Sequence, residues 1–246
     1  MSRTRDWDAG TYHRVSDVHQ EWAAQVLGRL QPARVVLDAG CGSGRVTQLL
    51  LEKCDHVIAV DAAPSMVEHA RETLGDRATV LQQDLLELSL PERVDAAFSN
   101  AVFHWVPDHP RLFAGLHKAL KPGGQLEAQY GGSGNVEHFL EAANEAGAGE
   151  PFAQYFDGWL RPWNFTTDEQ AREWLEAAGF EHVRTWLEKW PTRPGEPLDY
   201  IRTICLGPHL QVLPGELHAE YVRAVAERMP PEIDYVRLNV SARAAA

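Results

Sequence analysis

A short apolar segment followed by three closely spaced glycines limits what this chain can fold into. The segment spans residues 35–37, and the glycines are Gly40, Gly42 and Gly44. An apolar run with two β-branched valines is typical of a buried strand in a parallel sheet. Apolar residues at helical spacing follow over residues 46–50. The order of strand, glycine turn and helix predicts a nucleotide-binding α/β unit, in which glycines let a ligand reach the backbone.

The spacing of these glycines bears on which ligand the turn would hold. A dinucleotide-binding turn has the pattern G-x-G-x-x-G, but here the last position is Arg45 and the glycine comes one residue earlier, at Gly44. Asp38 precedes Gly40 by two residues, and an acidic group at the turn suits a cationic ligand better than a pyrophosphate. The pattern therefore argues against a nicotinamide dinucleotide, although an NAD-dependent enzyme stays the second class of function.

Composition excludes several other classes of function. With 246 residues, of which 44% are hydrophobic, the chain can form one large α/β domain. The net charge of −12 and the lack of a Lys/Arg cluster argue against a nucleic-acid partner, and no apolar run is long enough for a membrane span. Cys41, Cys54 and Cys205 have no metal-ligand spacing. We therefore expect a cytoplasmic protein with reduced thiols and no metal site.

Acidic residues follow two further predicted strands. Residues 56–60 predict a strand that ends at Asp61, and residues 78–83 predict another before Asp84. The carboxyl ends of adjacent parallel strands lie side by side, so Asp61 should face the glycine turn. Its carboxylate can accept hydrogen bonds from two ribose hydroxyls, as the acid does in dinucleotide folds.

Five ordered features together carry a family resemblance. They are LDAGCGSGR at residues 37–45, Asp61, Asp84, the segment FSNAVFHWV at 98–106, and LKPGG at 120–124. In this order they resemble class I S-adenosylmethionine (SAM) dependent methyltransferases of the small-molecule type, in particular relatives of trans-aconitate methyltransferase. The resemblance covers roughly residues 34–130.

The resemblance implies SAM as cofactor and S-adenosylhomocysteine as product. Within it, the acid at the third strand end receives the adenine amino group, and the fourth-strand segment lines the acceptor site. His104 is the candidate general base, because imidazole titrates near neutrality. The expected cofactor-binding residues are Asp38, Gly40, Cys41, Gly42, Gly44, Asp61, Ala62, Met66, Gln83, Asp84, Leu85, Asn100 and Ala101.

The acceptor is less constrained than the cofactor. Relatives of this type methylate a carboxylate oxygen, which would need cationic partners; candidates are Arg14, Arg161 and Arg202. An aromatic-rich segment suits O- or N-methylation of a natural product equally well. A SAM-binding protein without catalysis is a further alternative. The expected substrate-binding residues are Tyr12, His19, Trp22, Trp105, Tyr130, Trp159 and Trp163.

These patterns predict one methyltransferase domain over residues 1–246. We expect a Rossmann-like, doubly wound α/β fold with a mostly parallel seven-stranded sheet and helical cap insertions. An N-terminal arm and helix would occupy residues 1–30, and the SAM-binding core residues 31–130. The cap insertions would be residues 131–180 and 198–229, and the last two strands residues 183–190 and 233–240.

Overall fold

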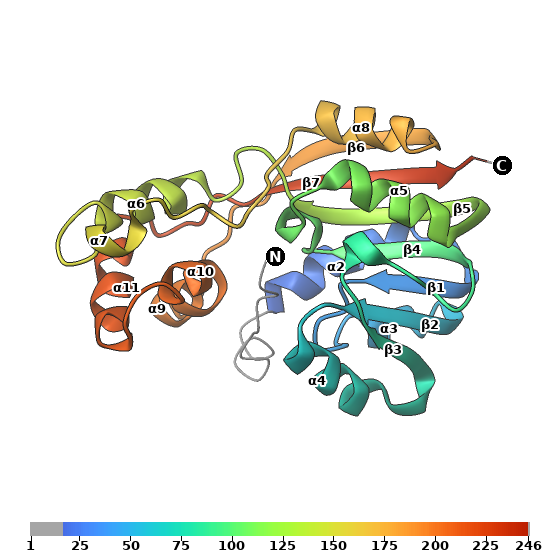
Figure 1. Cartoon of the computed structure of the whole chain (residues 1–246), viewed down its shortest axis with the longest axis horizontal. Coiled ribbons are helices and arrows are strands. Elements are labelled where there is room, and N and C mark those ends of the chain that lie inside the picture. Colours follow the sequence, from blue (N-terminus) through green and yellow to red (C-terminus); the bar gives the residue numbers. More distant parts are fainter. Residues whose placement is uncertain (1–16, 246) are drawn as a thin grey trace.

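Seven strands form one sheet within residues 17–245, the part of the chain that the computed structural model describes (Figure 1). The order across the sheet is β3-β2-β1-β4-β5-β7-β6, and β7 runs antiparallel to both of its neighbours while the other pairs are parallel. This confirms the Rossmann-like, mostly parallel α/β fold. The strands are β1 (Ala33–Ala39), β2 (Cys54–Asp61), β3 (Ala78–Gln82), β4 (Val94–Asn100), β5 (Leu120–Gly131), β6 (Phe180–Lys189) and β7 (Val236–Ala244).

Alternate residues of the central strands face two opposite layers of helices. On β1, Val36 belongs to one buried apolar cluster and Leu37 to another. The first cluster includes residues of α2 (Asp17–Arg29), α3 (Thr47–Leu50) and α4 (Pro64–Leu74). The second includes residues of α5 (His109–Ala119) and α8 (Asp168–Ala177). Burial on both faces explains why these strands read as continuous apolar runs.

A second lobe of short helices, which we call the cap, stands beyond one end of the sheet (Figure 1). Its apolar cluster includes Phe139, Leu206 and Tyr221, separate from the two clusters of the sheet. The Tyr221 hydroxyl donates a hydrogen bond to the Ala143 carbonyl at 2.9 Å, which ties two of the helices together. The cap helices are α6 (Glu137–Gly147), α7 (Ala153–Phe156), α9 (Pro197–Tyr200), α10 (Gly207–Leu210) and α11 (His218–Ala226). No helix within residues 17–245 has the length and apolar character that a membrane crossing requires.

Several boundaries differ from those that the sequence suggested, and burial explains two of the differences. Helix α8 falls inside the insertion expected over residues 131–180, yet its Ala171 and Leu175 pack in the cluster of the sheet. The last strand runs on to Ala244 instead of ending at Val240, because Ala242 and Ala244 continue the buried alternation. Small alanines in a short C-terminal stretch give little strand signal on their own.

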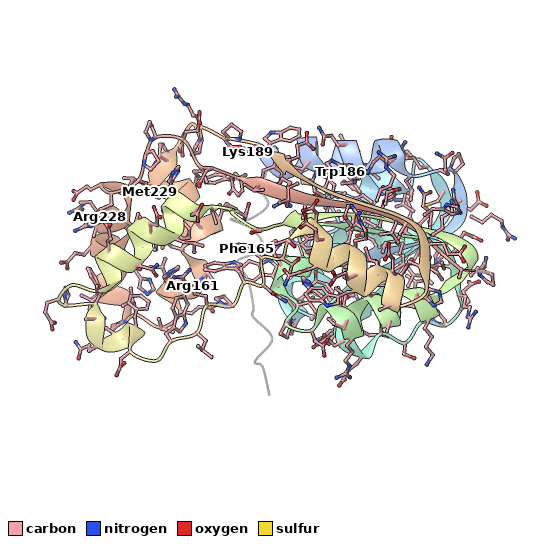
Figure 2. All side chains as sticks on the ribbon, turned by 90° about the horizontal axis from the view of Figure 1, so that it is seen from above. Arg161, Phe165, Trp186, Lys189, Arg228 and Met229 are labelled. Carbon is pink, nitrogen blue, oxygen red and sulfur yellow. The ribbon has the colours of Figure 1, made fainter. Side chains whose placement is uncertain are left out.

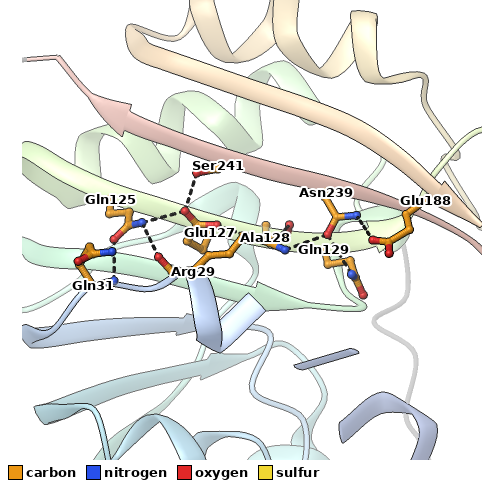
Figure 3. Close-up of polar contacts among 9 residues, drawn as sticks. All are labelled: Arg29, Gln31, Gln125, Glu127, Ala128, Gln129, Glu188, Asn239 and Ser241. Carbon is orange, nitrogen blue, oxygen red and sulfur yellow. Dashed lines mark hydrogen bonds and ion pairs between the residues drawn. The ribbon is translucent and has the colours of Figure 1, made fainter. Parts of the chain in front are cut away.

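A hydrogen-bonded polar network fastens α2 to the sheet (Figure 3). The Arg29 Nε donates to Glu127 Oε2 at 2.8 Å, and its Nη1 donates to Asn239 Oδ1 at 3.1 Å. Gln129 Nε2 donates to the same Asn239 oxygen at 2.9 Å. Since these groups are largely buried, their mutual hydrogen bonds offset the cost of removing them from water. The network therefore holds α2 in one position across β5 and β7.

Candidate active site

A cavity of about 820 Å³ lies at the carboxyl ends of β1, β2 and β4, between the sheet and the cap. Residues from the glycine turn line one end of it, which we call the turn end. Residues of the cap, together with Tyr235 and Arg237 at the beginning of β7, line the other, which we call the cap end. Open α/β sheets bind ligands at this edge. In Figure 2, Phe165 of the cavity wall lies where the cap meets the sheet.

The glycines of the turn have backbone conformations that side chains oppose. Gly40, Gly42 and Gly44 have φ angles of +88°, +53° and +81°. A Cβ on Gly40 would overlap the Val102 side chain, whereas a Cβ on Gly42 would meet no atom within 4 Å. Gly42 lines the cavity, so a side chain there would take up space that a ligand could use. Gly44, also expected at the cofactor, is not part of the wall and packs close to Leu74 of α4. The part of the turn around Gly42 fits the close approach of a cofactor to the backbone.

Asp61 connects the end of β2 to this turn. Its Oδ2 accepts a hydrogen bond from the Gly42 N–H at 2.9 Å, and its Oδ1 accepts one from the Ala63 N–H at 2.9 Å. Burial raises the pKa of Asp61, and these backbone donors oppose the rise. A carboxylate has about four acceptor positions, so the two backbone bonds leave capacity for ligand hydroxyls. The side chain lines the cavity, as the strand order predicts.

Asp38 is a second, more deeply buried acid beside the turn. The Thr47 hydroxyl donates a hydrogen bond to its Oδ2 at 2.7 Å. Burial raises the pKa of Asp38 to about 7; the Thr47 bond opposes the rise, and the Asp61 charge adds to it. Burial also raises the pKa of the Cys41 thiol, and both aspartates raise it further. Cys41 therefore stays a thiol near neutral pH and has a packing role in the turn.

One of the residues expected near the adenine lies away from the cavity. Met66, Asp84 and Leu85 line the cavity, as does Ala62. The Gln83 side chain is not among the lining residues; it is paired in both directions with the backbone of Ser89, at 2.8 and 2.9 Å. Strand β3 ends at Gln82, so Gln83 already belongs to the loop.

The end of β4 places His104 in the cavity wall together with Asn100 and Ala101. The Gly131 N–H donates a hydrogen bond to His104 Nδ1 at 3.2 Å. Because Nδ1 is the acceptor, the proton of the neutral ring is on Nε2. The imidazole is then a hydrogen-bond donor at its second nitrogen. The role of general base that the sequence suggested for His104 stays a prediction.

The aromatic residues expected at the acceptor divide into three groups. Trp22, Trp105, Trp159 and Trp163 line the cavity. Tyr130 does not: it is fully buried in the core, where its ring contacts Phe103 and His109. Tyr12 lies outside the described residues, and of His19 only the backbone position in α2 is described.

The cap end also contains cations, and the sequence pointed to only one of them. Arg161 lines the cavity, whereas Arg202 is exposed on the cap and is absent from the wall; Arg14 lies outside the described residues. Arg237, at the beginning of β7, lines the wall and is 2% exposed. The signal for it was an arginine between two apolar residues, Val236 and Leu238, since arginine is rarely buried unless it is paired.

The two ends of the cavity therefore differ in their balance of acidic and basic residues. Among the described lining residues, the turn end has three acids, Asp38, Asp61 and Asp84, and one cation, Arg45, while the cap end has the cations Arg161 and Arg237 and no acid. A cationic ligand suits the first and an anionic ligand the second.

Comparison with known sequences identifies the family. A family model described as a methyltransferase domain matches residues 37–128. Trans-aconitate 2-methyltransferase from Methylobacterium nodulans is 32% identical over 93% of this chain and 92% of its own length. The enzyme of the same name from Azoarcus sp. is 30% identical over 94% of both chains.

Solved structures share the fold at lower identity. The YcgJ protein from Bacillus subtilis matches with a TM-score of 0.65 and 14% identity, over 93% of this chain and 99% of its own. Phosphoethanolamine N-methyltransferase 2 from Haemonchus contortus, in complex with phosphomonomethylethanolamine and S-adenosylhomocysteine, has the same TM-score at 19% identity, over 97% of this chain and 57% of its own. The strand order, the glycine turn and the near full-length relatives agree, and the chain belongs to the class I SAM-dependent methyltransferases.

Proposed function

We propose that this methyltransferase transfers the methyl group to a carboxylate oxygen of a small anionic acceptor. The difference in charge along the cavity carries the proposal: three acids and one cation, Arg45, line the turn end, where a cationic sulfonium would bind, whereas Arg161 and Arg237 line the cap end with no acid among the described lining residues. Complementary charge of this kind steers and orients ligands. The names of the trans-aconitate 2-methyltransferase relatives support the same acceptor class.

The turn end would hold the cofactor through the residues described above. Gly42 leaves space for the methionine part, and Asp61 would accept hydrogen bonds from the ribose hydroxyls. Asp84 is exposed and lines the cavity, so it can accept from the adenine amino group, with Met66 and Leu85 against the ring. When bound, SAM supplies a methyl group on a sulfonium; its transfer forms one C–O bond and breaks one C–S bond, whose electron pair stays on sulfur.

The acceptor needs orientation more than it needs a base. A carboxylate is already ionised at neutral pH, and on becoming a methyl ester it releases no proton. The work left to the protein is to align the oxygen and to exclude water. His104 fits this task as a donor: its Nδ1 is used by Gly131, so Nε2 would offer a hydrogen bond to the acceptor.

Methyl transfer from radiolabelled SAM tests the proposal. The acceptors would be trans-aconitate, an aromatic amine and a phenol, each at equal concentration with the full-length protein. We expect label in trans-aconitate, and we expect alkali to release it as volatile methanol because esters hydrolyse in base. Alkali-stable label in the amine or the phenol would contradict the proposal.

The aromatic cap end supports one second candidate. Trp163 stacks on Phe165 with an interplanar angle of 12°, and Trp105 lies 5.7 Å from Trp163 between ring centroids. Such a wall suits a flat, partly apolar acceptor, so O- or N-methylation of a natural product is the alternative. The alkali-stable outcome of the same experiment identifies it.

A further inference from the structure

We propose that Arg237 selects acceptors that have a second carboxylate besides the one that is methylated, and that Trp22 and Gln129 are its positioning residues. The inference rests on the proposed function, since it assigns a specificity residue to the same acceptor site. It also makes a claim of its own, because it concerns binding of the acceptor and not the transfer.

Two contacts fix the position of the Arg237 guanidinium in the cavity wall. Its guanidinium carbon lies 4.3 Å above the centroid of the Trp22 ring, a cation–π contact with the face of the guanidinium. Its Nε donates a long hydrogen bond of 3.4 Å to Gln129 Oε1. These two contacts engage the face and one N–H of the group. Arg237 also lines the cavity, and a guanidinium there suits a carboxylate because its planar fork matches the two carboxylate oxygens.

The position of Arg237 follows from the polar network beneath it. The Asn239 side-chain oxygen accepts hydrogen bonds from Gln129 and from Arg29 of α2. The Asn239 side-chain nitrogen in turn donates a hydrogen bond to Glu188 at 3.4 Å (Figure 3). Glu188 is the partner of Arg237 in the β6–β7 register. Because the network holds both α2 and β7, the side chains of Trp22 and Arg237 are brought together without help from a ligand. A rigid cation loses little entropy when it binds an anion.

The group that Arg237 would bind is distinct from the group that is methylated. A carboxylate held in a bidentate guanidinium pair has its lone pairs occupied and its charge partly neutralised, which makes it a weaker nucleophile. The reacting oxygen must be near the turn end, where the sulfonium would lie. An acceptor with one carboxylate at each end of a short carbon chain satisfies both requirements.

Calorimetric binding to the full-length protein saturated with S-adenosylhomocysteine tests the inference without turnover. The two probes are trans-aconitate, a tricarboxylate, and crotonate, a monocarboxylate that also contains a carbon–carbon double bond. We expect wild type to prefer trans-aconitate. Arg237→Gln should lower the affinity for trans-aconitate by roughly 10- to 100-fold and remove most of the preference over crotonate. Arg202→Gln is the matched control, since it removes the same charge from an exposed cap residue outside the wall.

Two further variants separate the cation from its supports. Arg237→Lys keeps the charge and loses the fork, so we expect trans-aconitate to bind about fivefold to 20-fold more weakly. Gln129→Leu should lower the affinity for trans-aconitate less than the Arg237 variants do, and it should leave the affinity for S-adenosylhomocysteine unchanged. If Arg237→Gln does not fold, the lysine variant decides the matter by the same measurement.

The inference is overturned if wild type does not bind trans-aconitate, or if both Arg237 variants bind it within about twofold of wild type. Binding that depends on Arg237 without any methyl transfer would sink the proposed function alone. Transfer to trans-aconitate with an unchanged affinity in the Arg237 variants would sink the specificity role alone.

Discussion

The guanidinium of Arg237 stacks on the indole ring of Trp22, 4.3 Å from its centroid, although the two residues come from opposite ends of the chain. Trp22 also meets the ring of Tyr235 edge-on at 4.9 Å. All three side chains line the cavity. Helix α2 and the last strand thus form one wall of the proposed acceptor site together. A change that shifts α2 should therefore alter the shape of this wall.

Asp61 should be required for cofactor binding. Asp61→Ala removes the acceptor of the Gly42 and Ala63 N–H groups and the expected partner of the ribose hydroxyls. Each charge-assisted bond to the ribose contributes about 1.5–3 kcal/mol before compensation, so SAM affinity should fall roughly 100-fold or more. Calorimetry with SAM measures this. Asp55→Ala, at the exposed beginning of β2, is the control and should bind SAM as wild type does.

Gly42 and Gly75 allow backbone strain to be separated from loss of cavity space. Their φ angles are +53° and +55°, and a Cβ at either would meet no atom within 4 Å. Only Gly42 lines the cavity. Valine at either position should destabilise the fold by an amount on the order of 1–3 kcal/mol, but only Gly42→Val should abolish SAM binding. Equal SAM affinity in the two variants would show that the turn does not hold the cofactor.

Asp38 should make stability depend on pH. Burial raises its pKa from 3.8 to about 7, so between these values the native state holds a proton that the unfolded state has released. Stability therefore falls as pH rises from about 4 to about 7, by roughly 4 kcal/mol for this group. Asp38→Asn removes the group.

Urea unfolding of wild type and Asp38→Asn across this pH window isolates the effect of Asp38. We expect wild type to lose stability relative to the variant as pH rises, with the difference levelling off above pH 7. Parallel pH profiles for the two proteins would contradict the assignment.

Arg29 should contribute far more to stability than the neighbouring Arg34. Arg29 pairs at 2.8 Å with Glu127, whose side chain is 1% exposed, whereas Arg34 is 84% exposed and lies 3.9 Å from Asp55. Arg29→Met would leave a buried carboxylate without its cation, which costs about 3–5 kcal/mol. Arg34→Met should cost less than about 0.5 kcal/mol. Urea denaturation of both variants measures the contrast, and similar losses would mean that the network does not stabilise α2.

The parts of the site that follow from local sequence could be predicted, and those that depend on long-range pairing could not. The glycine turn and Asp61 follow from strand order alone, since parallel strands align their carboxyl ends. Arg237 reaches the cavity only because β7 inserts between β5 and β6, a pairing that no local pattern indicates.

Two residues that we expected at the site, Tyr130 and Gln83, lie outside the cavity wall, and strand geometry explains both cases. On β5, Gln125, Glu127 and Gln129 face the polar network, so the alternate residue Tyr130 faces the opposite, apolar layer. The alternation was visible in the sequence, but the face that borders the cavity was not. For Gln83, one residue past the end of β3 was enough to turn its side chain toward Ser89.

The central claim is that a carboxylate oxygen receives the methyl group, and the bond that forms is its most direct test. The protein would be incubated with trans-aconitate and SAM carrying a ¹³C-labelled methyl group, and the product would be analysed by two-dimensional NMR. The account predicts a labelled methyl that shows a long-range correlation to a carboxyl carbon, as a methyl ester must. A labelled methyl attached to carbon, or trans-aconitate left unlabelled while another acceptor in the same tube is methylated, would contradict it.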